Sequence, residues 1–135
     1  MTSRSLFARA RHLLMLAALL FCGSALAQVA PSHDPSRMIR NTDGRYWIFT
    51  TGDGIFAMSS PNSDFSGWRV EPTVFPVGTW PGWINNHVSG FNGFFWAPDI
   101  IKVGTEYRLY YSCAGQGAAA AIGLATATNL AGPWT

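Results

Sequence analysis

The distribution of apolar and polar positions along the chain is typical of β-structure. Short runs of β-branched and aromatic residues recur between clusters of glycine, proline, asparagine and aspartate. Apolar positions at helical spacing, every three to four residues, are nearly absent. The pattern therefore predicts an all-β chain, with strands at residues 36–40, 45–50, 55–59, 100–103, 107–112 and 120–126.

Turns are expected where residues that tolerate a positive φ, or that cap a turn with a side chain, gather between these strands. Such clusters are Asn-Thr-Asp-Gly at residues 41–44, Gly-Asp-Gly at 52–54 and Gly-Thr at 104–105. Because each cluster is short, the strands on either side of it are expected to form hairpins.

Two stretches of the chain repeat one another in residue type. Segments 43–49, 54–59 and 66–68 correspond in order to segments 104–110, 121–126 and 131–134. The offset is 61 residues between Tyr46 and Tyr107, and 66 residues between Trp68 and Trp134. A period of this length, made of hairpins closed by a tryptophan, suits one blade of a β-propeller.

The repeat length bears on completeness. A propeller closes with roughly four to eight blades, whereas residues 28–135 hold fewer than two repeats. Two blades alone would leave strand edges and apolar faces uncovered. We therefore expect residues 28–135 to be a truncated part of a propeller domain that does not fold alone and is poorly soluble by itself.

The first 27 residues have the order of a secretory signal peptide. Arginines precede the apolar run 13–21, and Ala-Leu-Ala follows at 25–27. This run is shorter than the roughly 20 residues that span a bilayer, so a membrane anchor is the weaker interpretation. The mature protein is expected to be secreted or periplasmic, and not attached to a membrane.

Removal of residues 1–27 changes the charge balance. Six of the nine basic residues and all seven carboxylates remain, so the net charge of the mature chain is −1. Without a basic patch, a nucleic-acid partner has little support. Cys113 is the one cysteine left, so no disulfide is expected within this chain, and its apolar surroundings predict a packed core thiol.

Five ordered segments carry a resemblance to a known family: 33–36 (His-Asp-Pro-Ser), 43–47 (Asp-Gly-Arg-Tyr-Trp), 96–100 (Trp-Ala-Pro-Asp-Ile), 110–112 (Tyr-Tyr-Ser) and 121–126 (Ala-Ile-Gly-Leu-Ala-Thr). Together they resemble the N-terminal third of the family 43 glycoside hydrolases, and most closely the endo-acting α-1,5-L-arabinanases. The resemblance covers essentially all of residues 33–135.

This resemblance implies a five-bladed β-propeller, of which the chain supplies roughly the first two blades, and an inverting mechanism with three carboxylates. Asp34 matches the general base of the opening blade, and the pKa-tuning aspartate and the glutamic acid belong to later blades. Residues 28–135 are therefore expected to be the truncated N-terminal part of this catalytic domain, without turnover because a base alone leaves the leaving group unprotonated. Inversion places base and acid about 6.5–9.5 Å apart, which leaves room for a water. Since a proline follows it, Asp34 is expected in extended backbone.

The resemblance also points to residues that contact sugar. Trp96 matches the start of the second blade's inner strand, where an indole face can stack on a sugar; plain core packing is the alternative. Trp80 and Trp83 are expected either to line a neighbouring subsite or to pack within the blade. Gly115, Gln116 and Gly117 replace a loop that carries an aromatic residue in related arabinanases, so Gln116 is expected either to bond a sugar hydroxyl or to lie in a flexible loop.

The remaining ionisable residues are expected to have other roles. Asp99 matches a structural position of the family, so a backbone hydrogen bond is favoured over a direct site role. His33 is expected to point away from Asp34, as neighbours in an extended strand do, and His87 to be an isolated loop residue. Glu71 and Glu106 lie in turn or loop settings and fit no acid motif. No metal-ligand spacing occurs in the chain, and the calcium ion that the resemblance implies for a complete enzyme would be held by a later blade.

The sequence thus predicts a secreted arabinan endohydrolase that acts on internal α-1,5-L-arabinofuranosyl links and is a monomer when complete. Two rivals remain open. One is an exo-acting arabinofuranosidase or xylosidase relative on arabinoxylan or xylo-oligosaccharides, and the other is a propeller that binds carbohydrate without catalysis. A decayed gene product without function is a third possibility.

Overall fold

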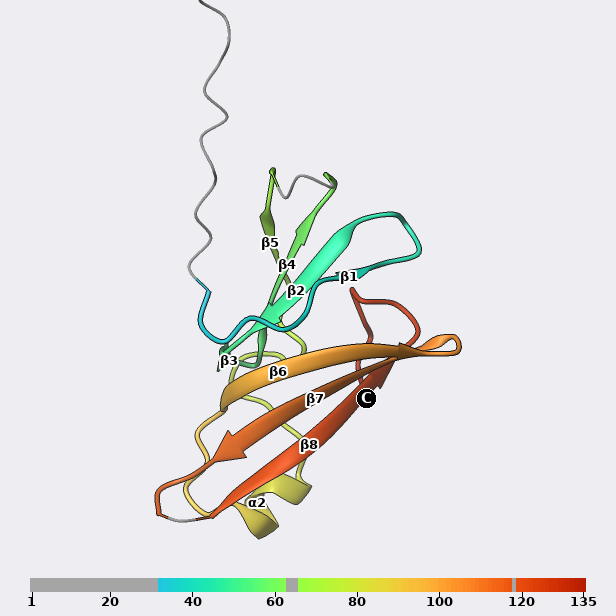
Figure 1. The fold of residues 1–135 in the computed structure, drawn as a ribbon. Coiled ribbons are helices and arrows are strands. Elements are labelled where there is room, and N and C mark those ends of the chain that lie inside the picture. Colours follow the sequence, from blue (N-terminus) through green and yellow to red (C-terminus); the bar gives the residue numbers. More distant parts are fainter. Residues whose placement is uncertain (1–31, 63–65, 118) are drawn as a thin grey trace, which may run out of the picture.

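The chain forms two four-stranded antiparallel sheets, which the computed structural model describes over residues 32–62, 66–117 and 119–135 (Figure 1). The predicted signal peptide lies outside these residues. The first sheet has the order β1 (Ile39–Arg40), β2 (Tyr46–Thr50), β4 (Phe56–Ser60), β5 (Arg69–Glu71). The second has the order β3 (Gly52–Asp53), β6 (Phe94–Val103), β7 (Glu106–Ala114), β8 (Ala120–Ala127).

The register of the strands confirms the repeat in the sequence. Tyr46 of β2 pairs with Ser60 of β4, and its repeat partner Tyr107 of β7 pairs with Ala127 of β8. The two hairpins therefore align residue for residue at this end, and each sheet is one copy of the same unit.

The repeat extends to the strand that follows each hairpin. Ser59 pairs with Arg69 of β5 in the first sheet. In the second sheet, the backbones of Thr126 and Thr135 exchange two hydrogen bonds of 2.7 and 3.0 Å. Thr135 thus occupies the position next to β8 that Arg69 occupies next to β4.

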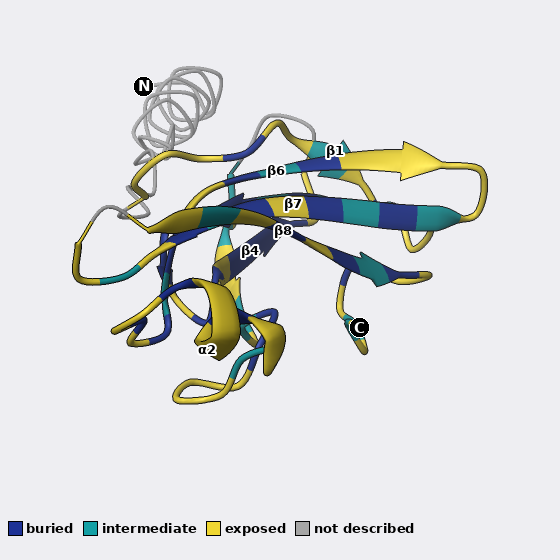
Figure 2. Ribbon diagram, turned by 90° about the horizontal axis from the view of Figure 1, so that it is seen from below, coloured by how far each residue is buried: buried dark blue, intermediate teal, exposed yellow. Residues whose placement is uncertain are grey.

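One buried apolar core is shared between the two sheets. Trp47 and Phe49 of β2 contribute to it from the first sheet, and Phe95 of β6 and Tyr111 of β7 from the second. Phe95 and Tyr111 meet edge to face with ring centroids 5.1 Å apart. Figure 2 shows buried residues alternating with exposed ones along β7, as expected for strands with one face on a core. Cys113 lies in this core, which confirms the predicted packed thiol.

The strand expected at residues 36–40 is regular only over Ile39–Arg40, so this prediction is largely wrong. Ser36 still lies beside β2, because its N–H donates to the carbonyl of Phe49 at 2.8 Å. The N–H of Phe49, however, donates to the hydroxyl of Ser36 at 3.0 Å and not to a backbone carbonyl. A side chain has replaced one half of the ladder.

The strand expected at 100–103 begins six residues earlier, at Phe94. Pro98 lies within this strand although it lacks an N–H for the ladder. The structure accommodates it by a shift of register between Trp96 and Asp99, where Ala97 has a positive φ of 42°. The strand therefore passes through the proline with a bulge.

Three short elements were not predicted from the sequence. Gly52–Asp53, expected as part of a turn, forms β3 against β6, and Arg69–Glu71 forms β5, so Glu71 ends a strand and does not lie in a turn. The third is the single-turn helix α2 (Trp83–His87), so the placement of His87 in a loop is also wrong. Five residues are too few to display a helical period. No helix in the described part of the chain is long and apolar enough to cross a membrane.

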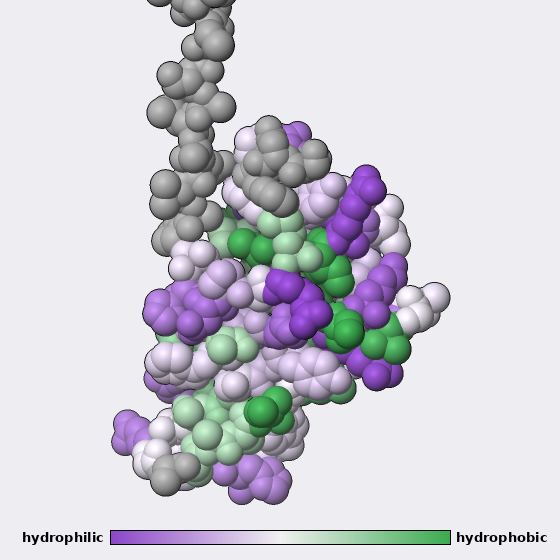
Figure 3. All heavy atoms as spheres, viewed as in Figure 1, coloured by the Kyte–Doolittle hydropathy of each residue, from purple (hydrophilic) through white to green (hydrophobic). Residues whose placement is uncertain are grey.

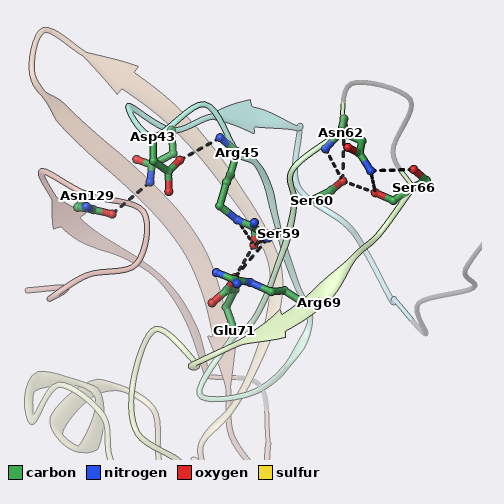
Figure 4. Close-up of polar contacts among 10 residues, drawn as sticks. Asp43, Arg45, Ser59, Ser60, Asn62, Ser66, Arg69, Glu71 and Asn129 are labelled. Atoms are coloured by element: carbon green, nitrogen blue, oxygen red, sulfur yellow. Dashed lines mark hydrogen bonds and ion pairs between the residues drawn. The ribbon is translucent and has the colours of Figure 1, made fainter.

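A polar cluster links the hairpins of the first sheet (Figure 4). The guanidinium of Arg45 donates to the hydroxyl of Ser59 at 2.7 and 2.9 Å, and this hydroxyl in turn donates to the carboxylate of Glu71. Arg69 donates to the same carboxylate. Ser59 is fully buried, and the Glu71 carboxylate lies between the guanidinium groups of Arg45 and Arg69. Glu71 therefore has a structural role.

The outer face of the second sheet carries exposed apolar side chains. Tyr110 pairs with Leu124 across β7 and β8, and Ile122 lies two residues before Leu124 on the same face. Their side chains are 42%, 45% and 76% exposed, respectively. Figure 3 shows apolar and polar residues interspersed on the side of the molecule that it presents. An exposed sheet face of this kind is suited to cover by a further sheet.

We expect Gly123→Ala to destabilise the fold. A Cβ at residue 123 would lie 2.3 Å from Cζ of Tyr111, whose ring is 1% exposed and has no room to move. Overpacking of this kind costs about 1–3 kcal/mol. The measurement is urea-induced unfolding followed by tryptophan fluorescence, on the longest soluble protein that carries these two sheets.

Gly82→Ala is the matched control, because residue 82 has helical backbone angles and no atom within 4 Å of the added Cβ. We expect its unfolding midpoint to be unchanged or slightly raised. Equal midpoints for the two variants would show that the Tyr111 ring is not a rigid neighbour of β8.

Candidate active site

Asp34 lies just before the first sheet, and two side chains hold its carboxylate. The hydroxyl of Thr51 donates to Oδ2 at 2.9 Å, and Nδ1 of His33 lies 2.9 Å from the same oxygen. Within residues 32–62, 66–117 and 119–135, no hydrogen bond to Oδ1 is found. The carboxylate is thus anchored through one oxygen, and its other oxygen is available to a ligand or water.

The backbone of Asp34 differs from the prediction. Its φ is +48°, so the residue is left-handed and not extended, although a proline follows it. Asp tolerates this region better than most residues, and the bonds to Oδ2 hold it there. Since the backbone is not extended, neighbouring side chains need not alternate. His33 therefore turns toward the carboxylate, and the expectation that it points away is wrong.

The surroundings of Asp34 favour its charged form. Hydrogen bonds from His33 and then from Thr51 lower the pKa of the Asp34 carboxyl below its ordinary value, against a smaller opposing effect of desolvation. A carboxylate that stays ionised at neutral pH can accept a proton at once. This is the protonation state that a general base requires.

Thr51 joins Asp34 to the second sheet. Its hydroxyl accepts the N–H of Ala97 at 2.9 Å while donating to Asp34, and its own N–H donates to the carbonyl of His33 at 2.9 Å. Ala97 directly follows Trp96. The bonds of one side chain therefore connect the carboxylate with the segment that carries the indole.

Trp96 lies on the wall of a surface hollow of about 230 Å³. Its indole is 44% exposed and absent from the shared core, so plain core packing is excluded within the two described sheets. Phe94 meets it at 5.2 Å between ring centroids and 71° between planes. The hollow brings these two rings together with Asn92 and with the loop after β7.

The loop expected to contact sugar supplies two residues to the same hollow, Gly115 and Gln116; Gly117 is exposed and does not line it. Gly115 has little freedom, because a Cβ there would lie 1.9 Å from the carbonyl oxygen of Ser89. Its N–H also donates to the carbonyl of Ala119 at 3.3 Å. The backbone is therefore braced at Gly115, and the exposed side chain of Gln116 follows directly.

The two tryptophans for which a subsite was considered lie elsewhere. Trp80 packs on Phe91 of the core at 5.3 Å, and its Nε1 donates to Asn85 at 2.9 Å. Trp83 begins α2, is 36% exposed and contacts His87 at 6.2 Å. Neither lines the hollow, so for Trp80 the packing alternative is the one observed.

Asp99 forms a bidentate pair with Arg37. Nε and Nη2 of Arg37 donate to its two oxygens at 3.0 and 2.6 Å, and the backbone N–H of Arg37 donates at 3.3 Å. The predicted backbone hydrogen bond is therefore confirmed. The side-chain bond to Arg37 is the largest of the effects that lower the pKa of Asp99. A direct contact of Asp99 with sugar stays a prediction.

Three residues at this site were missed from the sequence: Thr51, Asn92 and Phe94. Thr51 follows a predicted strand directly, and a polar residue at a strand end next to glycine was an available signal. Asn92 and Phe94 precede the Trp-Ala-Pro-Asp segment and carried no motif. No group of three or more His, Cys, Asp or Glu residues in the described ranges could hold a metal ion, so none of them is assigned as a ligand of the calcium ion mentioned above.

Comparison with known proteins gives consistent matches. A family model described as glycosyl hydrolases family 43 matches residues 29–135. A probable arabinan endo-1,5-α-L-arabinosidase C of Aspergillus clavatus is 38% identical over 107 residues, which cover 77% of this chain and 31% of the relative. An extracellular exo-α-(1→5)-L-arabinofuranosidase of Cellvibrio japonicus is 37% identical over 106 residues, which cover 78% of this chain and 28% of that protein.

Solved structures resemble the fold as well. The α-L-arabinanase of Cellvibrio cellulosa, solved in complex with arabinohexaose, matches with a TM-score of 0.66 and 34% sequence identity. The match covers 78% of this chain and 33% of that one. This chain thus spans about a third of the length of the proteins that it matches.

We expect Arg37→Gln to lower stability in a pH-dependent way. Because Arg37 holds the pKa of Asp99 down, the pair contributes stability above the unfolded-state pKa of an aspartate, about 3.9, and loses it as the pH falls through the lower folded-state value. Both partners are about half exposed, so the effect is small and weakens with salt. The urea midpoints of parent and variant should differ at pH 7 and converge as the pH falls below the folded-state pKa of Asp99.

Arg108→Gln serves as the control, since Arg108 pairs with Glu106 two residues away within one strand. Loss of this local pair should have less effect on the midpoint than loss of the pair that joins residue 37 to β6. A difference between parent and Arg37→Gln that stays constant down to pH 2 would contradict the assigned role of Asp99.

Proposed function

Because the chain belongs to glycosyl hydrolase family 43, we propose that its two sheets supply the general-base side of the active site of a secreted arabinan hydrolase. Arabinanases of the family are five-bladed β-propellers, and the two sheets are two such blades. The observation that carries the proposal is the Asp34 carboxylate, which is held ionised through Oδ2 and joined through Thr51 to the Trp96 segment.

The proposed reaction uses Asp34 as the base of an inverting hydrolysis. Oδ1 accepts a proton from a water as the water oxygen attacks the anomeric carbon from the side opposite the leaving group. A carboxylic acid from another blade protonates the leaving oxygen as the glycosidic bond breaks, about 6.5–9.5 Å from the base. His33 and Thr51 hold the base without taking its proton.

The hollow beside Trp96 suits an arabinofuranosyl unit of the substrate. The rings of Trp96 and Phe94 offer apolar surface for the C–H groups of a sugar, and the amides of Asn92 and Gln116 offer hydrogen bonds to its hydroxyls. Oδ1 of Asn92 already accepts the N–H of Phe94 at 3.2 Å, which leaves the side-chain NH₂ as the donor. Arabinan is the proposed substrate, and it is also the substrate in the name of the Aspergillus clavatus relative.

Secretion is part of the proposal and is supported by the order of residues 1–27 and by the extracellular relative. Action on internal α-1,5 links is supported by the relative named as endo-acting. Because another relative is named as exo-acting, exo cleavage is the second candidate, and product analysis separates the two.

Asp34→Asn is expected to abolish hydrolysis of linear arabinan, because an amide cannot accept the proton of water. Since the chain spans about a third of its relatives, the test uses a chimera in which residues 28–135 replace the matching part of the Cellvibrio cellulosa arabinanase. We expect kcat to fall by at least about 10²-fold. Asp43→Asn is the matched control, because Asp43 lies in the hairpin turn between β1 and β2 and its role there is to accept the N–H of Arg45. Retained activity in Asp34→Asn would sink the assignment of the base.

The size of the products tests the endo assignment. An endo-acting chimera should release a range of arabino-oligosaccharides from linear arabinan and lower its viscosity early in the reaction. Chromatography that finds a single short product from the first minutes onward would favour exo cleavage. Binding of arabinan with no products from a folded chimera would favour the non-catalytic alternative.

A further inference from the structure

We propose that Thr51 is a positioning residue of this site, which fixes the Asp34 carboxylate relative to the Trp96 wall of the hollow by hydrogen bonding to both sides at once. The inference rests on the proposed function. It concerns a residue that no motif of the sequence singles out.

Thr51 occupies the crossing between the sheets. It follows the last residue of β2, in the first sheet, and precedes the first residue of β3, in the second. Its side chain is buried, with 6% of the residue exposed. The residue is therefore held by both sheets, and its hydroxyl has a fixed place from which to act.

The hydroxyl of Thr51 uses both of its hydrogen-bonding capacities. It donates to Oδ2 of Asp34 and accepts the N–H of Ala97, each at 2.9 Å. Ala97 lies in the bulge of β6, where the ladder to β7 is interrupted between Trp96 and Asp99. The hydroxyl thus gives the N–H of this bulge residue a partner on one side and bonds the proposed base on the other.

Backbone strain marks the two ends of this bridge. Three non-glycine residues in the described part of the chain have a positive φ, and two of them are Asp34, at 48°, and Ala97, at 42°. Such conformations are costly and persist where the surroundings over-determine them. Both strained residues bond to the same oxygen atom. Two strained residues that meet at one hydroxyl indicate that this hydroxyl fixes their relative positions.

The expected consequence of Thr51→Val follows from its shape. Valine fills about the same volume but removes both hydrogen bonds of the hydroxyl, so the Asp34 carboxylate keeps only its contact with His33 and its charged form loses a donor. The pKa of Asp34 should rise toward its ordinary value, and the acidic limb of the kcat/KM profile should shift to higher pH. Thr51→Ser keeps the hydroxyl and should restore both properties.

The kinetic test compares Thr51, Thr51→Ser and Thr51→Val in the chimera described above. We expect kcat to fall about 10–100-fold in Thr51→Val, with KM changed much less, because a displaced base harms the transition state more than substrate binding. Thr51→Ser should lie within about threefold of the parent. An unshifted pH profile in Thr51→Val, or a serine variant as impaired as the valine one, would overturn the proposal.

A second measurement does not depend on activity. The carboxyl ¹³C resonance of Asp34, assigned by its loss in Asp34→Asn, gives the pKa of this group in each variant by titration. A pKa raised in Thr51→Val and restored in Thr51→Ser supports the positioning role even if the chimera does not hydrolyse arabinan, in which case the proposed function alone fails. Equal pKa values in all three proteins refute the role of Thr51. If Thr51→Val does not fold, Thr51→Ala, which also removes the hydroxyl, takes its place with the same expected rise in the pKa of Asp34.

Discussion

The apolar core shared by the two sheets is the constraint on which the rest of the structure depends. Phe49 from the first sheet and Phe95 and Tyr111 from the second are almost completely buried in one cluster. Because neither sheet covers its inner face alone, the sheets are held against each other, and the segments at their rim have fixed relative positions. The carboxylate of Asp34 and the indole of Trp96 are attached to this rim from different sheets.

Strand pairing is regular along the core strands and irregular in the segments at the edge of the two sheets. Ser36 substitutes a hydroxyl for a ladder carbonyl, the register of β6 shifts around Pro98, and the Thr51 hydroxyl accepts the N–H of Ala97 at this bulge. At these irregularities, a backbone N–H donates to a side-chain hydroxyl and not to the carbonyl of a neighbouring strand. The regular ladders thus provide rigidity, and the departures from them set the direction of the side chains that face the hollow.

Much of the fold could be predicted from the sequence, because period and turn chemistry act locally. The hairpin of Tyr46 and that of Tyr107 follow from alternation and from the glycine-containing turns, and their equivalence follows from the repeat. The true start of β6 could not be predicted, because a proline reads as a strand break unless a distant residue pairs with the bulge. The short elements β3, β5 and α2 depend on tertiary contacts and carry too few residues for a pattern.

The residues of the candidate site also fall into those that local sequence identifies and those that only the fold identifies. Asp34 and Trp96 were identified through motifs, whereas Thr51 and Phe94 act through neighbours that only the fold brings together. The expected direction of His33 was wrong for the same reason. Extended geometry was inferred from the proline after Asp34, but a hydrogen bond from a residue 17 positions along the chain overrides this local preference.

The tight contact at Gly115 has a consequence for how such a site can diverge. Since the Ser89 carbonyl leaves no room for a Cβ, a larger residue at 115 would displace the backbone of both loops, whereas the exposed side chain of Gln116 lines the hollow. Substitutions at 116 can therefore exchange one chemical group for another while the main chain stays in place. On the proposed function, a single substitution at residue 116 can change the chemical group offered to a sugar, whereas residue 115 has to stay glycine.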